Sequence, residues 1–205
     1  MKLYSFKLSG HSHRVRLFLS LLAIPYEHVE VDLATREQKS PEHLRLNPLG
    51  QVPVLVDGDL VLADSTAILV YLAKQYAPGN WLPDTPVEAA RVQRWLSVAS
   101  GEITYGLAAA RLITLFGAPR NAEEVIGRSH AILAVLDAEL ARSDWLVGSA
   151  ATIADIAIYT YVERAAEGNV DRSRYSNISR WLRRVEALPG FIPFTRSPVG
   201  LEVAA

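Results

Sequence analysis

Three short groups of polar residues in the first third of the chain carry side chains that can do chemistry. The first, Ser9-Gly10-His11-Ser12, lies between an apolar strand and an amphipathic helix. Ser9 and Ser12 both suit the cap of that helix, and either hydroxyl could instead donate a hydrogen bond to a thiolate. No acid–histidine–serine triad is evident, so nucleophilic serine catalysis is not supported. His11 and His13 do not share a helix face, and no carboxylate lies at ligand spacing, so we expect no metal site.

The second group is Gln51-Val52-Pro53. Proline is unusual inside a strand because it cannot donate to the ladder of hydrogen bonds. A cis bond at the edge of a sheet is one explanation, and it would let the Val52 backbone pair with an extended peptide. An ordinary trans proline in an edge strand explains the pattern equally well.

The third group, Asp64-Ser65, opens a helix. Ser65 fits the N-cap, and the free N–H groups of the first turn favour a carboxylate. Asp64 beside it can hold an ammonium group. One helix start therefore offers partners for both charges of an amino-acid end group, although a simple helix cap is the commoner use of such a pair.

Hydrophobic periodicity predicts the elements that must position these groups. Apolar residues recur on one face of a helix over 12–23, while Arg14 and Arg16 lie away from that face. Alternating residues predict a half-buried strand over 27–33, and a tight turn at Gly58 joins a hairpin. The predicted strands are 2–6, 27–33, 52–56 and 60–62, and the predicted helices are 12–23 and 65–76, with a short helix after Pro41. A helix crossover followed by a hairpin gives a mixed sheet.

The remainder of the chain is predicted to be helical. Residues 77–87 contain three prolines and a glycine, which is typical of a linker. Helices are expected at 86–116, 121–142, 153–167 and 176–188. The predicted fold class is therefore an α/β thioredoxin-like N-terminal domain at 1–78, followed by an all-α helical-bundle C-terminal domain at 86–205.

Composition excludes several classes of function. The chain has 205 residues, a formal net charge of −1 and no cysteine. The charge gives no reason to expect nucleic acid or an anionic membrane as a partner. Without cysteine there is no disulfide, thiolate zinc site or protein thiol nucleophile. The chain starts directly as a strand with no signal peptide, and the apolar stretch 17–24 is too short to span a bilayer, so we expect a cytoplasmic protein.

The order and spacing of these groups resemble the glutathione S-transferase superfamily over essentially the whole chain. The likeness is to phi-, zeta- and theta-like members of the serine type. The matching runs are Lys2-Leu3-Tyr4, Ser9, Arg14-Val15-Arg16, 38–44, 47–53, 57–60, Asp64-Ser65, 148–155 and 181–191. The run from Asn47 to Pro53 and the Asp64-Ser65 pair are specific in combination.

The resemblance implies a role for each matched position. Ser9 takes the place of the catalytic serine, and the implied glutathione site comprises His11, Lys39, Gln51, Val52, Pro53, Asp64 and Ser65. Lys39 and Gln51 would contact the glycine and γ-glutamyl portions. Val52, before a cis Pro53, would pair with the cysteinyl backbone. Asp64 and Ser65 would bind the γ-glutamyl ammonium and carboxylate.

Three departures from the family patterns narrow the activity. Zeta-class enzymes carry Ser-Ser-Cys where this chain has Ser9-Gly10-His11, which argues against a maleylacetoacetate isomerase. Phi-class members usually have histidine before the lysine, where this chain has Gln38. Omega- and beta-like members use a cysteine, so thiol–disulfide exchange through a protein thiol is excluded.

The implied activity is conjugation of the glutathione thiolate to a small hydrophobic electrophile, as in detoxification, with glutathione as co-substrate and no other cofactor. Tyr105, Arg111 and Leu112, with Phe116, are candidates for the second-substrate pocket, although core packing is the commoner use of such residues. Two alternatives remain open. One is a non-catalytic ligand-binding or protein-interaction module, and the other is a glutathione-dependent isomerase or dehalogenase.

Two structural expectations complete the sequence-based interpretation. The resemblance implies a homodimer, and small residues on the first long helix of the second domain would allow close helix approach; they are Ala89, Ala90, Ala99, Ala108, Ala109 and Ala110. Arg91 and Arg94 could pair across the two-fold axis. Thr152 and Asp155 fit a capping box rather than a catalytic pair, because each can satisfy a backbone N–H at a helix start.

Overall fold

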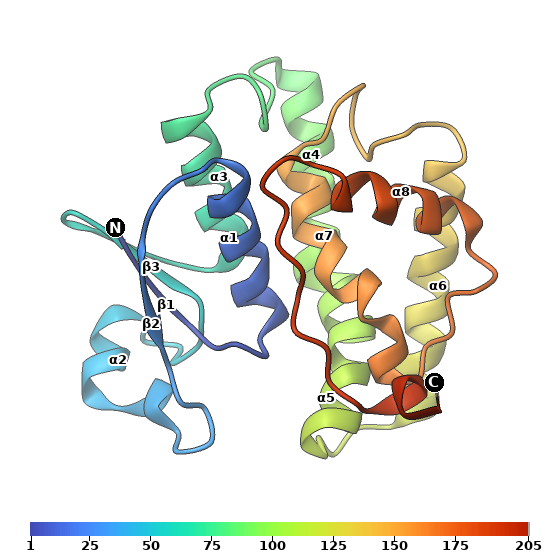
Figure 1. Ribbon diagram of the computed structural model, residues 1–205, viewed down its shortest axis with the longest axis horizontal. Coiled ribbons are helices and arrows are strands. Elements are labelled where there is room, and N and C mark those ends of the chain that lie inside the picture. The colour runs from blue at the N-terminus through green and yellow to red at the C-terminus, as the bar shows by residue number, and fades with distance from the viewer. Residues whose placement is uncertain (205) are drawn as a thin grey trace.

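A computed structural model describes residues 1–204 and shows an N-terminal half with a sheet beside a helical C-terminal half (Figure 1). The N-terminal half, up to residue 76, contains a four-stranded sheet in the order β2-β1-β3-β4, with β1 parallel to β2 and antiparallel to β3. The strands are β1 (Lys2–Ser5), β2 (Glu27–Glu30), β3 (Val54–Asp57) and β4 (Leu60–Ala63). The helices of this half are α1 (Gly10–Leu21), α2 (Pro41–Leu46) and α3 (Ser65–Tyr76). The predicted mixed sheet is confirmed.

The second half is helical over the described residues. Its elements are α4 (Pro86–Val98), α5 (Ala109–Phe116), α6 (Ala122–Leu140), α7 (Ile153–Glu163) and α8 (Ser176–Glu186), with short 3₁₀ turns at Ala165–Gly168 and Gly200–Ala204. Helices α1 and α3 pack against α7, so the sheet's inner helices and the bundle share one interface (Figure 1). Helix α2 lies on the side of the sheet away from the bundle. The fold class expected from sequence is therefore confirmed.

The long predicted helix over 86–116 is interrupted. Between α4 and α5, residues Ala99–Ala108 form a π-helical stretch, η2. The Thr104 hydroxyl donates to the Ala99 carbonyl five residues earlier, at 2.8 Å, which follows the same wider winding. Such stretches are rare and often occur at functional sites. Through Ser100 and Thr104, residues of η2 line one wall of the cavity that holds the candidate active site.

The bounds of two strands differ from those predicted, because of the local structure at their ends. The strand predicted over 27–33 ends at Glu30, because Asp32 turns the chain by accepting from the N–H groups of Ala34 (2.8 Å) and Thr35 (3.3 Å). The strand predicted over 52–56 starts only at Val54, directly after a cis peptide bond at Pro53. This bond resolves the cis–trans alternative in favour of cis.

The Thr152–Asp155 capping box is confirmed at the start of α7, which is buried along its whole length. The Asp155 carboxylate is fully buried and accepts four hydrogen bonds. Its donors are the Leu146 N–H (3.1 Å), the Thr152 N–H (2.9 Å), the Thr152 hydroxyl (3.1 Å) and the Trp181 indole (2.9 Å). Asp155 therefore joins the start of α7 to α8 and to the loop before α7.

Replacing Asp155 by alanine is expected to lower the free energy of unfolding by at least about 3 kcal/mol. Loss of a cap alone costs about 0.5–2 kcal/mol, and here buried donors would also be left without an acceptor. Urea denaturation measures the change. Asp171→Ala, which removes an exposed carboxylate bonded only to Ser173, is the matched control and should change stability by about 0.5 kcal/mol or less. An unchanged midpoint with lost turnover in Asp155→Ala would contradict this structural role.

The chain after α8 runs back between the two halves (Figure 1). The Ser20 hydroxyl on α1 donates to the Gly190 carbonyl at 2.6 Å, and His13 hydrogen-bonds the Ile192 carbonyl at 3.1 Å. Farther along, Arg164 donates to the Phe194 carbonyl. The tail is therefore held by both halves of the molecule.

Part of the physical argument for a dimer is wrong. Ala99, Ala108, Ala109 and Ala110 are buried in the chain's own core, so they cannot bring two subunits together. Arg94 lies 3.7 Å from Glu139 of α6 within the same chain. Within the described residues, no helix is long and apolar enough to cross a membrane.

Candidate active site

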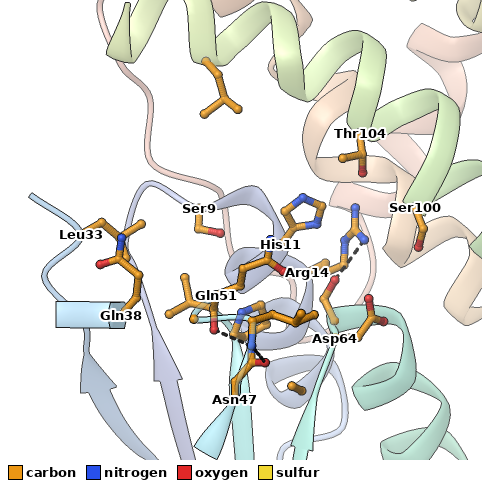
Figure 2. A pocket seen from close by; sticks show the side chains of 17 residues that line it. Ser9, His11, Arg14, Leu33, Gln38, Asn47, Gln51, Asp64, Ser100 and Thr104 are labelled. Atoms are coloured by element: carbon orange, nitrogen blue, oxygen red, sulfur yellow. Dashed lines mark hydrogen bonds between the residues drawn. The ribbon is translucent and has the colours of Figure 1, made fainter. Parts of the chain in front are cut away.

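A cavity of about 620 Å³ lies between the end of the sheet and the helical half (Figure 2). The loop before α1, the loop before β3 and the start of α3 form one side, and Ser100 and Thr104 of η2 form the other. The three polar groups singled out in the sequence all reach this cavity, although they are up to 56 residues apart along the chain; Ser9, His11, Gln51, Val52, Pro53, Asp64 and Ser65 line it.

Ser9 is the N-cap of α1 and faces the cavity. Its Oγ accepts the backbone N–H of Ser12 at 3.2 Å. Because that bond uses a lone pair of the oxygen, the hydroxyl proton remains available to a group in the cavity. The helix N-terminus adds partial positive charge at the same point.

Ser12 is placed differently. It is fully buried beneath Ser9, and its Oγ accepts the Phe6 N–H at 3.2 Å. It is not among the residues that line the cavity. Of the two serines, the geometry therefore favours Ser9 as a donor to a bound ligand.

The loop before β3 forms the floor of the cavity. Two side chains, His43 Nε2 and Asn47 Nδ2, each lie 3.0 Å from the Gln51 carbonyl oxygen and fix the loop in place. Val52 then presents its backbone at the cavity edge, before cis Pro53. An extended peptide could pair with this short unpaired segment.

Asp64, rather than Ser65, is the N-cap of α3, so the predicted cap position was wrong by one residue. Asp64 Oδ1 accepts from the Thr66 hydroxyl at 2.5 Å and from the Thr66 and Ala67 N–H groups at 2.8 and 2.9 Å. Burial raises the pKa of the carboxyl, but these bonds, the hydroxyl's first, outweigh it and lower the pKa. Its φ of 74° lies in the left-handed region, which is costly for a residue with a side chain and is most often retained at functional sites. Oδ2 accepts no hydrogen bond from residues 1–204 and could bind a cation.

Ser65 follows as the first residue of α3 and is buried against Arg14. The Arg14 Nη1 donates to the Ser65 Oγ at 3.1 Å (Figure 2). With its lone pair engaged, the Ser65 hydroxyl can donate its own proton into the cavity. An anion placed there would meet both this hydroxyl and the N-terminus of α3.

Arg14 is the main feature that the sequence interpretation missed. It is only 1% exposed, yet it lines the cavity, and neither Nε nor Nη2 has a hydrogen-bond partner among the described residues. Burial lowers the pKa of Arg14 to about 10, so the side chain is still charged near neutral pH. It lies one turn before the buried Phe18, and this i,i+4 relation is the signal that could have placed it on the buried face.

A second, smaller cavity of about 180 Å³ adjoins the first on the side of the helical bundle. Its lining is mostly apolar or aromatic and includes Tyr105, Leu112, Phe116 and Tyr161. The Arg111 side chain also borders it, but its guanidinium is committed elsewhere. Three exposed hydrophobic side chains meet here, since Tyr105, Leu112 and Phe116 are 53%, 39% and 53% exposed. An apolar ligand could cover them.

Arg111 belongs to a buried network that joins three parts of the chain. Its guanidinium donates to the Glu167 carboxylate at 2.5 Å, to the Leu8 carbonyl at 2.7 Å and to the Ser197 hydroxyl at 3.4 Å. Leu8 directly precedes Ser9. Arg111 therefore holds the loop before α1. The sequence offered it as a candidate for the second-substrate pocket, which it borders, and a contact with that substrate stays a prediction.

Comparison with known proteins identifies the family. A protein of Zea mays named Glutathione S-transferase 3 is 38% identical over 168 residues, which cover 76% of this chain and 73% of that protein. The chain belongs to the glutathione S-transferase family. The models of the glutathione S-transferase N-terminal and C-terminal domains match residues 1–74 and 119–184. The exact boundaries at 78 and 86 stay predictions.

Solved structures of glutathione S-transferases agree with the fold over nearly the whole chain. One from Pseudomonas fluorescens is 33% identical with a TM-score of 0.90, covering 95% of this chain and 98% of that one. A glutathione transferase of Phanerochaete chrysosporium, solved with oxidized glutathione, is 27% identical with a TM-score of 0.83, covering 92% and 90%. The glutathione S-transferase fold is thus shared over more than nine-tenths of the chain.

One residue implied by the glutathione S-transferase resemblance lies at the margin of the site. Lys39 is exposed, and its Nζ donates to the Leu49 carbonyl at 2.8 Å instead of pointing into the main cavity. Its neighbour Gln38 lines the cavity. A role for Lys39 toward the glycine end of glutathione stays a prediction and would require that this bond be exchanged.

Gly10, one of the residues that distinguish this chain from zeta-class members, is required by close packing. A Cβ at Gly10 would lie 2.5 Å from Cζ of Tyr161, which packs on the first turn of α1. Gly10 therefore lets a tyrosine from α7 lie directly behind Ser9 and His11.

Among the described residues no group of three or more His, Asp and Glu side chains is placed to hold a metal ion.

Proposed function

We propose that this chain conjugates the thiolate of glutathione to a hydrophobic electrophile, with Ser9 stabilising the thiolate. The observation that supports the proposal most directly is the Ser9 hydroxyl. It faces the main cavity from the N-cap of α1, its lone pair is engaged by the Ser12 N–H, and its proton is free to donate. A hydroxyl at a helix N-terminus favours an anion over a neutral thiol.

The proposed chemistry needs no general base in the protein. The glutathione thiol, with a pKa of roughly 8.5 when free, releases its proton to water as the bound thiolate forms. Each unit by which the site lowers that pKa requires about 1.4 kcal/mol of preferential stabilisation of the thiolate. The sulfur lone pair then forms a bond to the electrophilic carbon, and the electrons of the broken bond leave with the leaving group or move onto the acceptor.

Charges in the cavity match the two ends of glutathione. Asp64 offers a carboxylate oxygen to the γ-glutamyl ammonium, and Ser65 offers its hydroxyl and the start of α3 to the γ-glutamyl carboxylate. We propose that Arg14 completes this pair of sites, since its unpartnered buried charge favours an anion nearby. Val52 would pair with the cysteinyl backbone, which directs the sulfur toward Ser9.

The second cavity supports a hydrophobic second substrate. It opens beside Ser9, and Tyr105 and Leu112 give it an apolar lining. A molecule bound there would have its reactive carbon next to the sulfur of glutathione in the main cavity, because Ser9 borders both spaces. Arg111 contributes by holding Leu8, and its charged group is not free for the substrate.

A titration with glutathione combined with a panel of electrophiles tests this function. Binding of glutathione together with turnover of at least one electrophile supports the proposal. Binding without turnover of any electrophile would favour a non-catalytic module instead. Isomerisation or dehalogenation without formation of a stable conjugate would favour the glutathione-dependent isomerase or dehalogenase.

We also propose a homodimer. The edge strand β4 presents Leu60 and Val61, which are 38% and 42% exposed, and Val87 at the start of α4 is 63% exposed. An unpaired edge strand with apolar side chains is a surface that soluble proteins usually cover. Light scattering at micromolar concentration should give twice the chain mass of 22.6 kDa. A mass equal to one chain would refute the dimer.

A further inference from the structure

The main cavity and the second cavity share a short wall. Five residues border both spaces: Ser9, His11, Leu33, Thr104 and Leu112. A side chain in this wall can touch glutathione on one side and the second substrate on the other. Three of the five carry polar groups, and their hydrogen bonds differ.

Only His11 has an uncommitted donor besides Ser9. The Thr104 hydroxyl donates to the Ala99 carbonyl at 2.8 Å, so its proton is engaged within η2. Neither ring nitrogen of His11 makes a hydrogen bond among residues 1–204, and the residue lines both cavities. In Figure 2 the ring points away from the sheet, toward the helix that carries Thr104.

The ring of His11 is held in place and kept neutral. It meets Tyr161 edge to face, with ring centroids 5.1 Å apart. Burial and, next, the charge of Arg14 lower the pKa of His11 to about 3, against a smaller opposing effect of Asp64. A neutral imidazole has one N–H donor and one acceptor nitrogen, and it keeps both over the whole physiological pH range.

We infer that the His11 imidazole contacts the electrophile and donates its N–H to an oxygen conjugated with the reactive carbon. The class of second substrate that fits is an α,β-unsaturated carbonyl compound with an apolar tail. The tail would lie along Tyr105 and Leu112, and the carbonyl would turn back to the shared wall. This inference rests on the proposed function, and it replaces the role in glutathione binding that the family resemblance implies for His11.

The step balances without a further reactant. The sulfur lone pair forms the S–C bond at the β-carbon, the electron pair of the C=C bond shifts between the α- and carbonyl carbons, and the carbonyl pair moves onto the oxygen. The His11 N–H strengthens its hydrogen bond as negative charge develops on that oxygen, and the proton stays on the ring. Water then protonates the α-carbon, which offsets the proton that glutathione released.

The test compares two electrophiles in wild type, His11→Leu, His11→Asn and Thr104→Val. The electrophiles are trans-2-nonenal, which carries a conjugated carbonyl, and 1-iodohexane, which has no acceptor oxygen. The ratio of kcat/KM for the enal to that for the iodide should fall at least ten-fold in His11→Leu. It should recover in part in His11→Asn, because the amide supplies a neutral N–H. In Thr104→Val the ratio should stay within three-fold, because that hydroxyl is already committed.

The outcomes separate this inference from the proposed function. If His11→Leu converts the iodide and the enal-to-iodide ratio of kcat/KM is unchanged, the role of His11 is overturned. The proposed transferase function is not affected by that result. An equal loss on both electrophiles that asparagine does not restore also overturns it, since a packing defect would act that way. If wild type converts only the enal, no ratio can be formed. The inference then requires that kcat/KM for the enal fall in His11→Leu and recover in part in His11→Asn, and it is overturned if either change is absent. Turnover of neither electrophile overturns this inference, whereas the transferase function is overturned only if no member of the wider panel is converted. A glutathione titration of each variant verifies that it is folded.

Discussion

Replacing Ser9 by alanine is expected to lower turnover at least ten-fold while glutathione affinity stays within several-fold. The Ser9 hydroxyl donates to the sulfur only after the thiol has lost its proton, so it stabilises the thiolate. Removing the hydroxyl therefore raises the pKa of the bound glutathione thiol by about one unit. Turnover should therefore fall most at low pH and recover partly as the pH rises, because more thiolate then forms without help. Affinity should persist, since the peptide is held by Asp64, Ser65 and the Val52 backbone.

The measurement is a pH–rate profile of kcat/KM with a single electrophile, together with the thiolate absorbance of bound glutathione. Ser12→Ala is the matched control, because it removes a hydroxyl three residues farther along, in the first turn of α1. Its Oγ serves the buried Phe6 N–H, so its loss should cost about 1–3 kcal/mol of stability and leave the profile in place. Full activity in Ser9→Ala with loss in Ser12→Ala would reverse the assignment.

Replacing Arg14 by methionine is expected to weaken glutathione binding at least ten-fold without destabilising the protein. The guanidinium is desolvated, and two of its nitrogens have no partner among the described residues, so its charge costs free energy in the absence of ligand. An apolar side chain of similar length removes that cost. The same change removes the buried cation that, among residues 1–204, lies beside Ser65, and with it much of the attraction for the γ-glutamyl carboxylate.

Calorimetric titration with two ligands tests the role of Arg14. One ligand is glutathione, and the other is γ-aminobutyryl-cysteinylglycine, which lacks the α-carboxylate. Wild type should prefer glutathione, whereas Arg14→Met should show a much smaller preference, carried by Ser65 and the start of α3 alone. Arg16→Met is the control, because Arg16 lies on the same helix, points to the Lys7 carbonyl and does not line the cavity. An equal loss of affinity for both ligands in Arg14→Met would mean that the carboxylate is not its target.

The sequence predicted the elements well because most of their signals are local. The hairpin at Gly58 and the capping box at Thr152 each depend on a few neighbouring residues, and both are confirmed. The strand over 27–33 was predicted too long because the side chain of Asp32 competes with the ladder. The π-helical stretch Ala99–Ala108 leaves no mark in hydrophobic periodicity, because wider winding over only ten residues shifts the pattern too little.

The site was predicted less completely because it depends on packing between distant segments. Ser9, Asp64 and Ser65 carry recognisable local patterns, and the structure brings them to one cavity. Arg14 lies just off the expected apolar stripe, and only the position of α3 shows that its charge is buried beside Ser65. For Arg111, the residue type suggested a ligand contact, whereas the partner that decides its orientation is Glu167, 56 residues away.

The buried contacts of Arg111 make the two halves of the molecule one cooperative unit. To separate them, the Leu8 carbonyl must leave the guanidinium, and the apolar faces that α1 and α3 share with α7 must enter water. Separating the two halves requires both changes at once, so we expect the halves to unfold together and not one before the other. A protease that cuts at the exposed turn 78–80, between α3 and α4, would therefore leave two fragments that remain associated and still enclose the cavity.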